Sequence, residues 1–108
     1  MKNILLIDTS DNKKISVTLN INDKLFSVTS DPTKLKSQIV LTLIDKLLKD
    51  HNLRLEDITA VEVNLISGSF TGVRVGASIA NALGFALKIP INGKKVGDFV
   101  EPLYNDLI

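Results

Sequence analysis

The sequence predicts a single α/β domain with the element order β-β-β-α-β-α-β, a mixed sheet flanked by helices and a short C-terminal helix. Three observations predict this class: three short strand-like segments come first, two longer segments with helical spacing follow, and a glycine-rich turn precedes the second of them. The chain has 108 residues, of which 44% are hydrophobic. This length suffices for one hydrophobic core but not for two, so one domain is expected to span residues 1–108.

The first three strands are expected at residues 3–7, 14–21 and 25–28. In the second of these, Ile15, Val17 and Leu19 alternate with polar residues and share one face. Polar turn residues separate the first two segments, and Asn22-Asp23 is typical of a tight turn between strands. The three strands are therefore expected to form an antiparallel meander.

The first helix is expected at residues 33–50, after Pro32, which is tolerated at the start of a helix. Its apolar residues recur at helical spacing, and Asp45 lies one turn before Lys49, where the two can form an ion pair. This apolar stripe consists of Leu35, Ile39, Leu43 and Leu47.

The second half of the chain predicts a strand at residues 60–65, a helix at about 71–88 and a short last strand at Pro90-Ile91. Residues 96–107 have helical spacing, but Gly97 and Pro102 make the terminal helix short or kinked.

Both helices carry more apolar surface than one sheet face can cover. In the second helix, one side is expected to pack on the sheet and holds Val75, Ile79, Ala82, Leu83 and Ala86. In the first, Leu41, Ile44 and Leu48 widen the apolar stripe, and a further side of the second helix presents Gly76, Ala80 and Gly84. The excess either packs helix against helix within the domain or marks a protein interface.

The composition excludes several functional classes. Thirteen basic and twelve acidic residues give a net charge of +1 without a basic run, which disfavours direct tRNA or DNA binding. There is no cysteine and only one histidine, His51, so we expect no metal site and no thiol chemistry. No apolar stretch is long enough for a signal peptide or a membrane span, so we expect a cytoplasmic protein without membrane contact.

Two motifs are candidates for a site. The glycine loop comprises Gly68, Ser69, Phe70, Thr71, Gly72 and Arg74. Its hydroxyls can cap the helix and leave backbone N–H groups for an anion, or the glycines merely form the turn. Asp8, Thr9 and Ser10 at the end of the first strand are either an anion or metal site or a turn cap. No catalytic nucleophile and base can be paired, so no catalytic residue and no cofactor are assigned.

The motif Gly-Ser-Phe-Thr-Gly-x-Arg-x-Gly at residues 68–76, together with Ile4-Leu5-Leu6-Ile7-Asp8-Thr9-Ser10, resembles the TsaB (YeaZ) family. The similarity follows the same order along nearly the whole chain and corresponds to the N-terminal subdomain of that family. It implies one lobe of the actin-like or RNase H-like (ASKHA) fold.

The resemblance also implies a function. Members of the family are non-catalytic partners of the TsaD transferase, in a complex with the ATPase TsaE, in forming threonylcarbamoyladenosine in tRNA. It implies a heterodimer with a TsaD-like protein, a homodimer when alone, tRNA contact that is at most indirect, and a partner surface at Leu41, Ile44, Leu48, Gly76, Ala80 and Gly84. Two alternatives stay open: a small homodimeric enzyme that binds a phosphate-bearing ligand, and a dimerisation module unrelated to tRNA.

Overall fold

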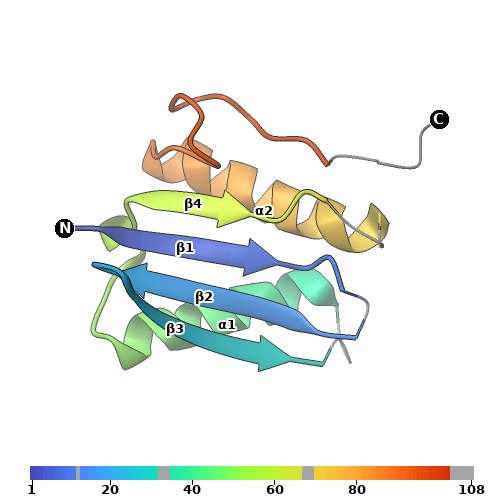
Figure 1. The fold of residues 1–108 in the computed structure, drawn as a ribbon, viewed down its shortest axis with the longest axis horizontal. Helices are drawn as coiled ribbons and strands as arrows, with labels where there is room; N and C mark the ends of the chain where they lie inside the picture. Colours follow the sequence, from blue (N-terminus) through green and yellow to red (C-terminus); the bar gives the residue numbers. More distant parts are fainter. Residues whose placement is uncertain (12, 32–34, 67–69, 103–108) are drawn as a thin grey trace.

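The structure, a computed structural model, describes residues 1–11, 13–31, 35–66 and 70–102, with the side chains of residues 70 and 71 excepted. This part of the chain forms one four-stranded sheet with the strand order β3-β2-β1-β4 and two α-helices (Figure 1). The elements follow the predicted order: β1 (Asn3–Asp8), β2 (Ile15–Ile21), β3 (Lys24–Ser30), α1 (Lys36–Asp50), the 3₁₀ turn η1 (Leu55–Asp57), β4 (Ala60–Val63) and α2 (Phe70–Leu87).

The sheet is mixed, as predicted. β1 pairs antiparallel with β2, with Leu5 opposite Leu19, and parallel with β4, with Leu5 opposite Val61. β2 and β3 form a hairpin whose two turn residues, Asn22 and Asp23, both have positive φ values of 50° and 74°. This geometry matches the right-handed twist of the flanking strands, which explains why a short polar pair suffices for the turn.

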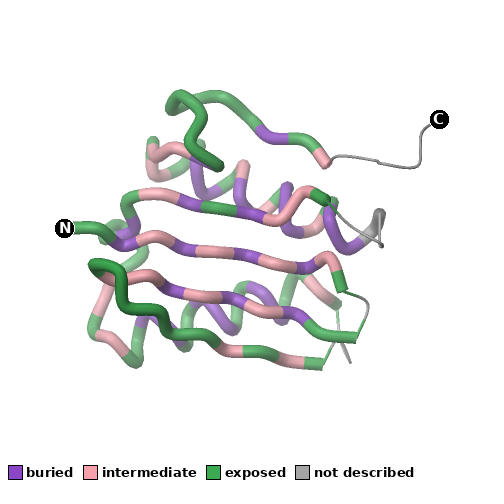
Figure 2. Tube along the Cα trace, viewed as in Figure 1, coloured by how far each residue is buried: buried purple, intermediate pink, exposed green. Residues whose placement is uncertain are grey.

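Both helices cover the same face of the sheet (Figure 1). Along β1 the alternation is strict: Leu5 and Ile7 are buried beneath the helices, whereas Ile4 and Leu6 on the opposite face are only half-buried. Figure 2 shows this as alternating purple and pink along β1 and β2. Among the described residues no helix covers the second face, which we call the open face; the predicted sheet is flanked on one side only.

Several boundaries differ from prediction. The described part of α1 begins at Lys36 rather than residue 33, and residues 32–34 lie outside the described part. The last strand is reduced to one parallel bridge between Val61 and Ile91. The predicted ion pair between Asp45 and Lys49 is confirmed, at 2.9 Å.

The predicted C-terminal helix is absent from residues 93–102, and residues 103–108 lie outside the described part. Gly97 has a φ of 99°, which is incompatible with a helix. The Asn81 side chain of α2 holds the segment instead: its Nδ2 donates to the Val100 carbonyl (2.9 Å), and its Oδ1 accepts from the Val100 N–H (2.8 Å). Tertiary hydrogen bonds thus replace the intrahelical ones.

The assignment of the two sides of α2 was wrong. Gly76, Ala80 and Gly84 were expected at a partner surface, but all three are buried. A Cβ at Gly76 would lie 2.7 Å from Thr9 Oγ1, and one at Gly84 would lie 2.5 Å from Ile91 Cδ1. The small residues let α2 approach the sheet. Of the side expected in the core, only Leu83 is buried; Val75 and Ile79 are half-buried, and Ala82 and Ala86 are exposed.

Thr9 fixes this close approach. Its side chain is fully buried; the hydroxyl donates to the Gly72 carbonyl and accepts from the Gly76 N–H (3.1 Å). These two backbone groups stand in the i and i+4 relation that an α-helix bonds directly. The end of β1 is therefore tied into the first turns of α2.

We expect Gly76→Ala to lower the free energy of unfolding by about 1–3 kcal/mol, because the added methyl group overpacks a site where Thr9 is held by two hydrogen bonds. Gly84→Ala is the comparison at an apolar contact, since the added methyl group would meet Ile91 Cδ1 (2.5 Å) and Cγ1 (2.7 Å) without displacing a hydrogen-bonded hydroxyl. Chemical denaturation measures the free energy of unfolding of both variants. A Gly76→Ala variant as stable as the wild type would contradict the proposed role of Thr9.

Candidate functional site

The carboxyl ends of β1 and β4 form the candidate site. The two strands are parallel neighbours, so the residues that follow them meet at one edge of the sheet, where α/β proteins commonly bind ligands. Asp8 is the last residue of β1, Thr9 and Ser10 follow it, and Asn64 follows β4.

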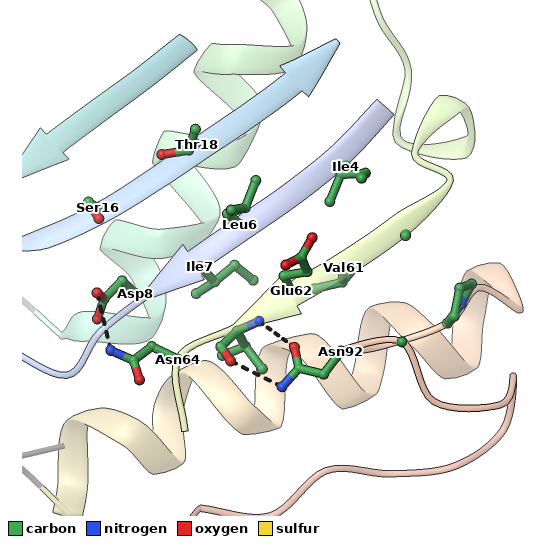
Figure 3. Close-up of a pocket in the computed structure, with 14 residues that line it drawn as sticks. Ile4, Leu6, Ile7, Asp8, Ser16, Thr18, Val61, Glu62, Asn64 and Asn92 are labelled. Carbon is green, nitrogen blue, oxygen red and sulfur yellow. Dashed lines mark hydrogen bonds between the residues drawn. The ribbon is translucent and has the colours of Figure 1, made fainter. Parts of the chain in front are cut away.

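Asp8 is the centre of a local hydrogen-bond network. Its Oδ1 accepts from the Ser10 N–H (2.9 Å) and the Ser10 hydroxyl (2.6 Å), as in an Asx turn. The Asn64 Nδ2 lies 3.4 Å from Asp8 Oδ2 and 3.1 Å from Ser10 Oγ (Figure 3 shows Asn64 beside Asp8). Asp8 therefore caps the turn, as the simpler of its two interpretations predicted, and Asn64 links this turn to β4.

The carboxyl of Asp8 has a pKa below its ordinary value. Partial burial acts to raise this pKa, but the hydrogen bonds from Ser10 and Asn64 and the positive charge of Lys14 together outweigh it. Asp8 is therefore a stable carboxylate near neutral pH, suited to accepting hydrogen bonds rather than to releasing a proton.

The glycine loop is described only in part. Gly68 and Ser69 lie outside the described residues, as do the side chains of Phe70 and Thr71, whereas Gly72 is buried and Arg74 is exposed on α2. Through Thr9, the start of α2 adjoins the Asp8 turn. The two motifs singled out in the sequence thus meet in space; anion binding there stays a prediction.

The open face of the sheet beside this site is hollowed into a trough of about 850 Å³ (Figure 3). The residues that line the trough change from polar to apolar along β1. Asp8 lies between Ser16 and the end of β4, Leu6 lies between Thr18 and Glu62, and the far end is apolar, with Ile4 beside Ala60. Glu62 is exposed on this face.

Sequence reasoning missed Ser16, Thr18 and Asn92 as lining residues of the trough. Strand alternation was the available signal for Ser16 and Thr18, since both fall on the face opposite Ile15 and Val17. Asn92 lies in a turn with a φ of 51°, and nothing in the local pattern indicates the contact of its side chain with β4.

A second hollow of about 320 Å³ lies on the helical side. Leu41 of α1 is 54% exposed at its rim, while Ile44 and Leu48 are 4% and 5% exposed within it. Leu83 of α2 completes the wall. Three predicted interface residues thus gather here, and the three small residues of α2 do not.

The described residues hold no group of three or more His, Cys, Asp or Glu side chains that could bind a metal ion. Within the same part of the chain, neither helix has the length and apolar character required to cross a membrane.

Residues 31–93 match the family model described as "TsaD: tRNA N6-adenosine threonylcarbamoyltransferase". This match covers more than half of the chain. The chain belongs to this family. Within the TsaD family, curated relatives include the tRNA threonylcarbamoyladenosine biosynthesis protein TsaB of Buchnera aphidicola from Schizaphis graminum, 34% identical over 90 residues. That alignment covers 83% of this chain and 42% of the relative.

A tRNA N6-adenosine threonylcarbamoyltransferase of Nitrosospira multiformis is 36% identical over 69 residues, which cover 62% of this chain and 20% of that one. Among solved structures, YeaZ from Pseudomonas aeruginosa superposes with a TM-score of 0.78 at 28% identity, covering 88% of this chain and 44% of that one. The resemblance to TsaB (YeaZ) and the actin-like or RNase H-like lobe are confirmed, and the chain spans less than half the length of these relatives.

We expect the free energy of unfolding to fall less steeply at acid pH in Asp8→Asn than in the wild type. The folded-state pKa lies below the ordinary value of 3.8, so ionised Asp8 stabilises the fold above about pH 4, and this contribution is lost as pH falls through the folded-state pKa. Denaturation at several pH values between about 7 and 2 measures the slope. Exposed Asp98→Asn controls for the lost charge. Equal slopes of unfolding free energy against pH for the wild type and Asp8→Asn would contradict the stabilising role of the hydrogen bonds to Asp8.

Proposed function

We propose that this chain is a non-catalytic partner of a TsaD-like transferase in the formation of N6-threonylcarbamoyladenosine in tRNA. The family match supports the pathway, since relatives named for this modification align with most of the chain. The partner complex includes a TsaE-like ATPase, the chain forms a homodimer when alone, and tRNA is contacted at most indirectly.

The observation that carries the partner role is the apolar surface left on the helices. We call it the helical face and define it by Leu41 with the outward side of α2, formed by Val75, Ile79, Ala82 and Ala86. Helical spacing places these four residues of α2 on the side of Leu83, which shares the hollow with Leu41. Apolar surface around a hollow is the usual form of a protein-binding site.

The small residues of α2 lie on the opposite side of the helix from this surface and pack against the sheet. Because Gly76 and Gly84 let α2 approach the sheet, the larger side chains at positions 75, 79, 82 and 86 remain on its outer side. The partner surface proposed here therefore keeps Leu41. Ile44 and Leu48, which were also expected at the partner surface, are buried and line the hollow beneath Leu41, and the outward residues of α2 replace Gly76, Ala80 and Gly84.

A non-catalytic role fits the polar groups near the Asp8 turn. The Asp8 carboxylate is engaged by Ser10 and Asn64, and the Thr9 hydroxyl is committed to α2. These contacts maintain the fold and leave neither group available as a nucleophile or base in this arrangement. The transferase chemistry is accordingly assigned to the partner.

We expect Leu41→Glu to weaken binding to the TsaD-like transferase of the same source at least tenfold, or about 1.4 kcal/mol, because a charge would be buried in an apolar contact. Val96→Glu is the matched control, since Val96 is 55% exposed and Leu41 is 54% exposed. Titration calorimetry gives both affinities, and circular dichroism checks folding. Equal binding by wild type and Leu41→Glu would overturn the assigned surface.

A further inference from the structure

The strand β1 is apolar on both of its faces. Leu5 and Ile7 are buried beneath the helices, whereas Ile4 and Leu6 line the trough on the open face (Figure 3). A strand with one face in water usually alternates apolar and polar residues, and an uninterrupted apolar run is typical of a strand covered on both faces. Among the described residues no helix covers the open face. The sequence of β1 therefore fits a sheet that receives a further layer over the trough.

The apolar end of the trough extends beyond β1. Ala60 of β4 is the register partner of Ile4, and Pro90 lines the same trough. On the other side of Ile4 the row continues through Asn20 to Leu25, since residues paired across strands share a face. Leu25 is 65% exposed. A covering layer would thus remove apolar surface from water across the whole width of the sheet.

The charges that line the trough are negative. Asp8 and Glu62 are its charged residues in the described part of the chain, and Lys14, which acts on Asp8 through its charge, does not line the trough. Glu62 is exposed and forms no ion pair with any described residue. Two carboxylates beside an apolar surface favour a partner that brings a lysine or an arginine, because complementary charges select the partner.

The covering element fits an α-helix better than a strand. The backbone groups of β1 are paired with β2 and β4, so a layer on this face packs through side chains and not through strand pairing. From Ile4 to Asp8 the strand rises about 13 Å, which corresponds to about nine residues of helix. A helix of this length reaches from the apolar end of the trough to the two carboxylates.

A second copy of this chain does not match these requirements. Two open faces placed together would bring Asp8 and Glu62 of one copy toward the same carboxylates of the other, and such like-charge contacts are unfavourable. Both described helices already contribute buried residues to the core of their own domain. The complementary element therefore belongs to a different protein.

We propose that the trough is a docking groove for an amphipathic helix of another protein, with apolar side chains over Ile4 and Leu6 and a lysine or arginine that pairs with Glu62 or Asp8. The groove lies on the opposite side of the sheet from the helices (Figure 1). It is separate from the helical face, so both surfaces can be occupied at once, and it does not depend on the proposed function.

The test uses two fluorescein-labelled peptides of about fifteen residues, a length at which an isolated helix begins to form. Both carry leucine along one side of the helix; the first has lysine on the flanks and the second has glutamate. Fluorescence anisotropy should show that the full chain binds the lysine peptide and not the glutamate peptide. Glu62→Lys should weaken binding of the lysine peptide about tenfold, and Glu62→Gln should weaken it less, because only the first reverses the charge.

Glu101→Lys is the matched control, because Glu101 is exposed, lies outside the trough and undergoes the same change of charge. It should bind the lysine peptide as the wild type does, with folding of every variant checked by circular dichroism. Equal affinities of Glu62→Lys and Glu101→Lys would overturn the proposal, since the attraction would then follow net charge alone. Absence of binding to the wild type would also overturn it.

Leu41→Glu separates this groove from the helical face. This variant should bind the lysine peptide with unchanged affinity, while its binding to the transferase is weakened. Loss of peptide binding in Leu41→Glu would place the peptide on the helical face and contradict the docking groove. Conversely, Glu62→Lys should bind the transferase as the wild type does, so failure of the groove and failure of the proposed function give different results.

Discussion

The contact between Thr9 and the first turns of α2 is the constraint on which the rest of the structure depends. The Thr9 hydroxyl is buried between the Gly72 carbonyl and the Gly76 N–H, and this position is accessible only because residue 76 has no side chain. A polar group so deeply buried is tolerated because both its donor and its acceptor capacity are used. The contact sets the depth of α2 against the sheet and brings the Asp8 turn to the start of α2.

The position of α2 decides which of its sides is free. A helix drawn close to the sheet by Gly76 and Gly84 has its remaining apolar residues on its outer side, and Leu83 at the border of that side shares a hollow with Leu41 of α1. The same packing that forms the core thus creates the helical face. The apolar excess is a consequence of where the small residues lie, and it is the surface proposed above for the partner.

The remaining surfaces of the sheet differ in polarity and in hydrogen bonding. The open face passes from polar residues around Asp8 to apolar ones around Ile4, and the β4 edge is closed by the amide of Asn92. The helical face lies on the other side of the sheet from the open face.

The sequence by itself determined the element order, the β2–β3 hairpin, the mixed α/β class and the family, because these follow from short-range periodicity, turn residues and a contiguous glycine motif. It also located Asp8, Thr9 and Ser10. Only the tertiary structure decided which side of α2 faces the sheet, because Gly76 and Ala80 fit both a close helix–sheet contact and a partner surface. The roles of Asn81 and Asn92 were likewise decided by contacts with Val100 and Val63, distant in sequence, which replace a terminal helix and a full last strand. Local patterns carry no information on such pairings, because the hydrogen bonds that compete with helix and strand come from other elements.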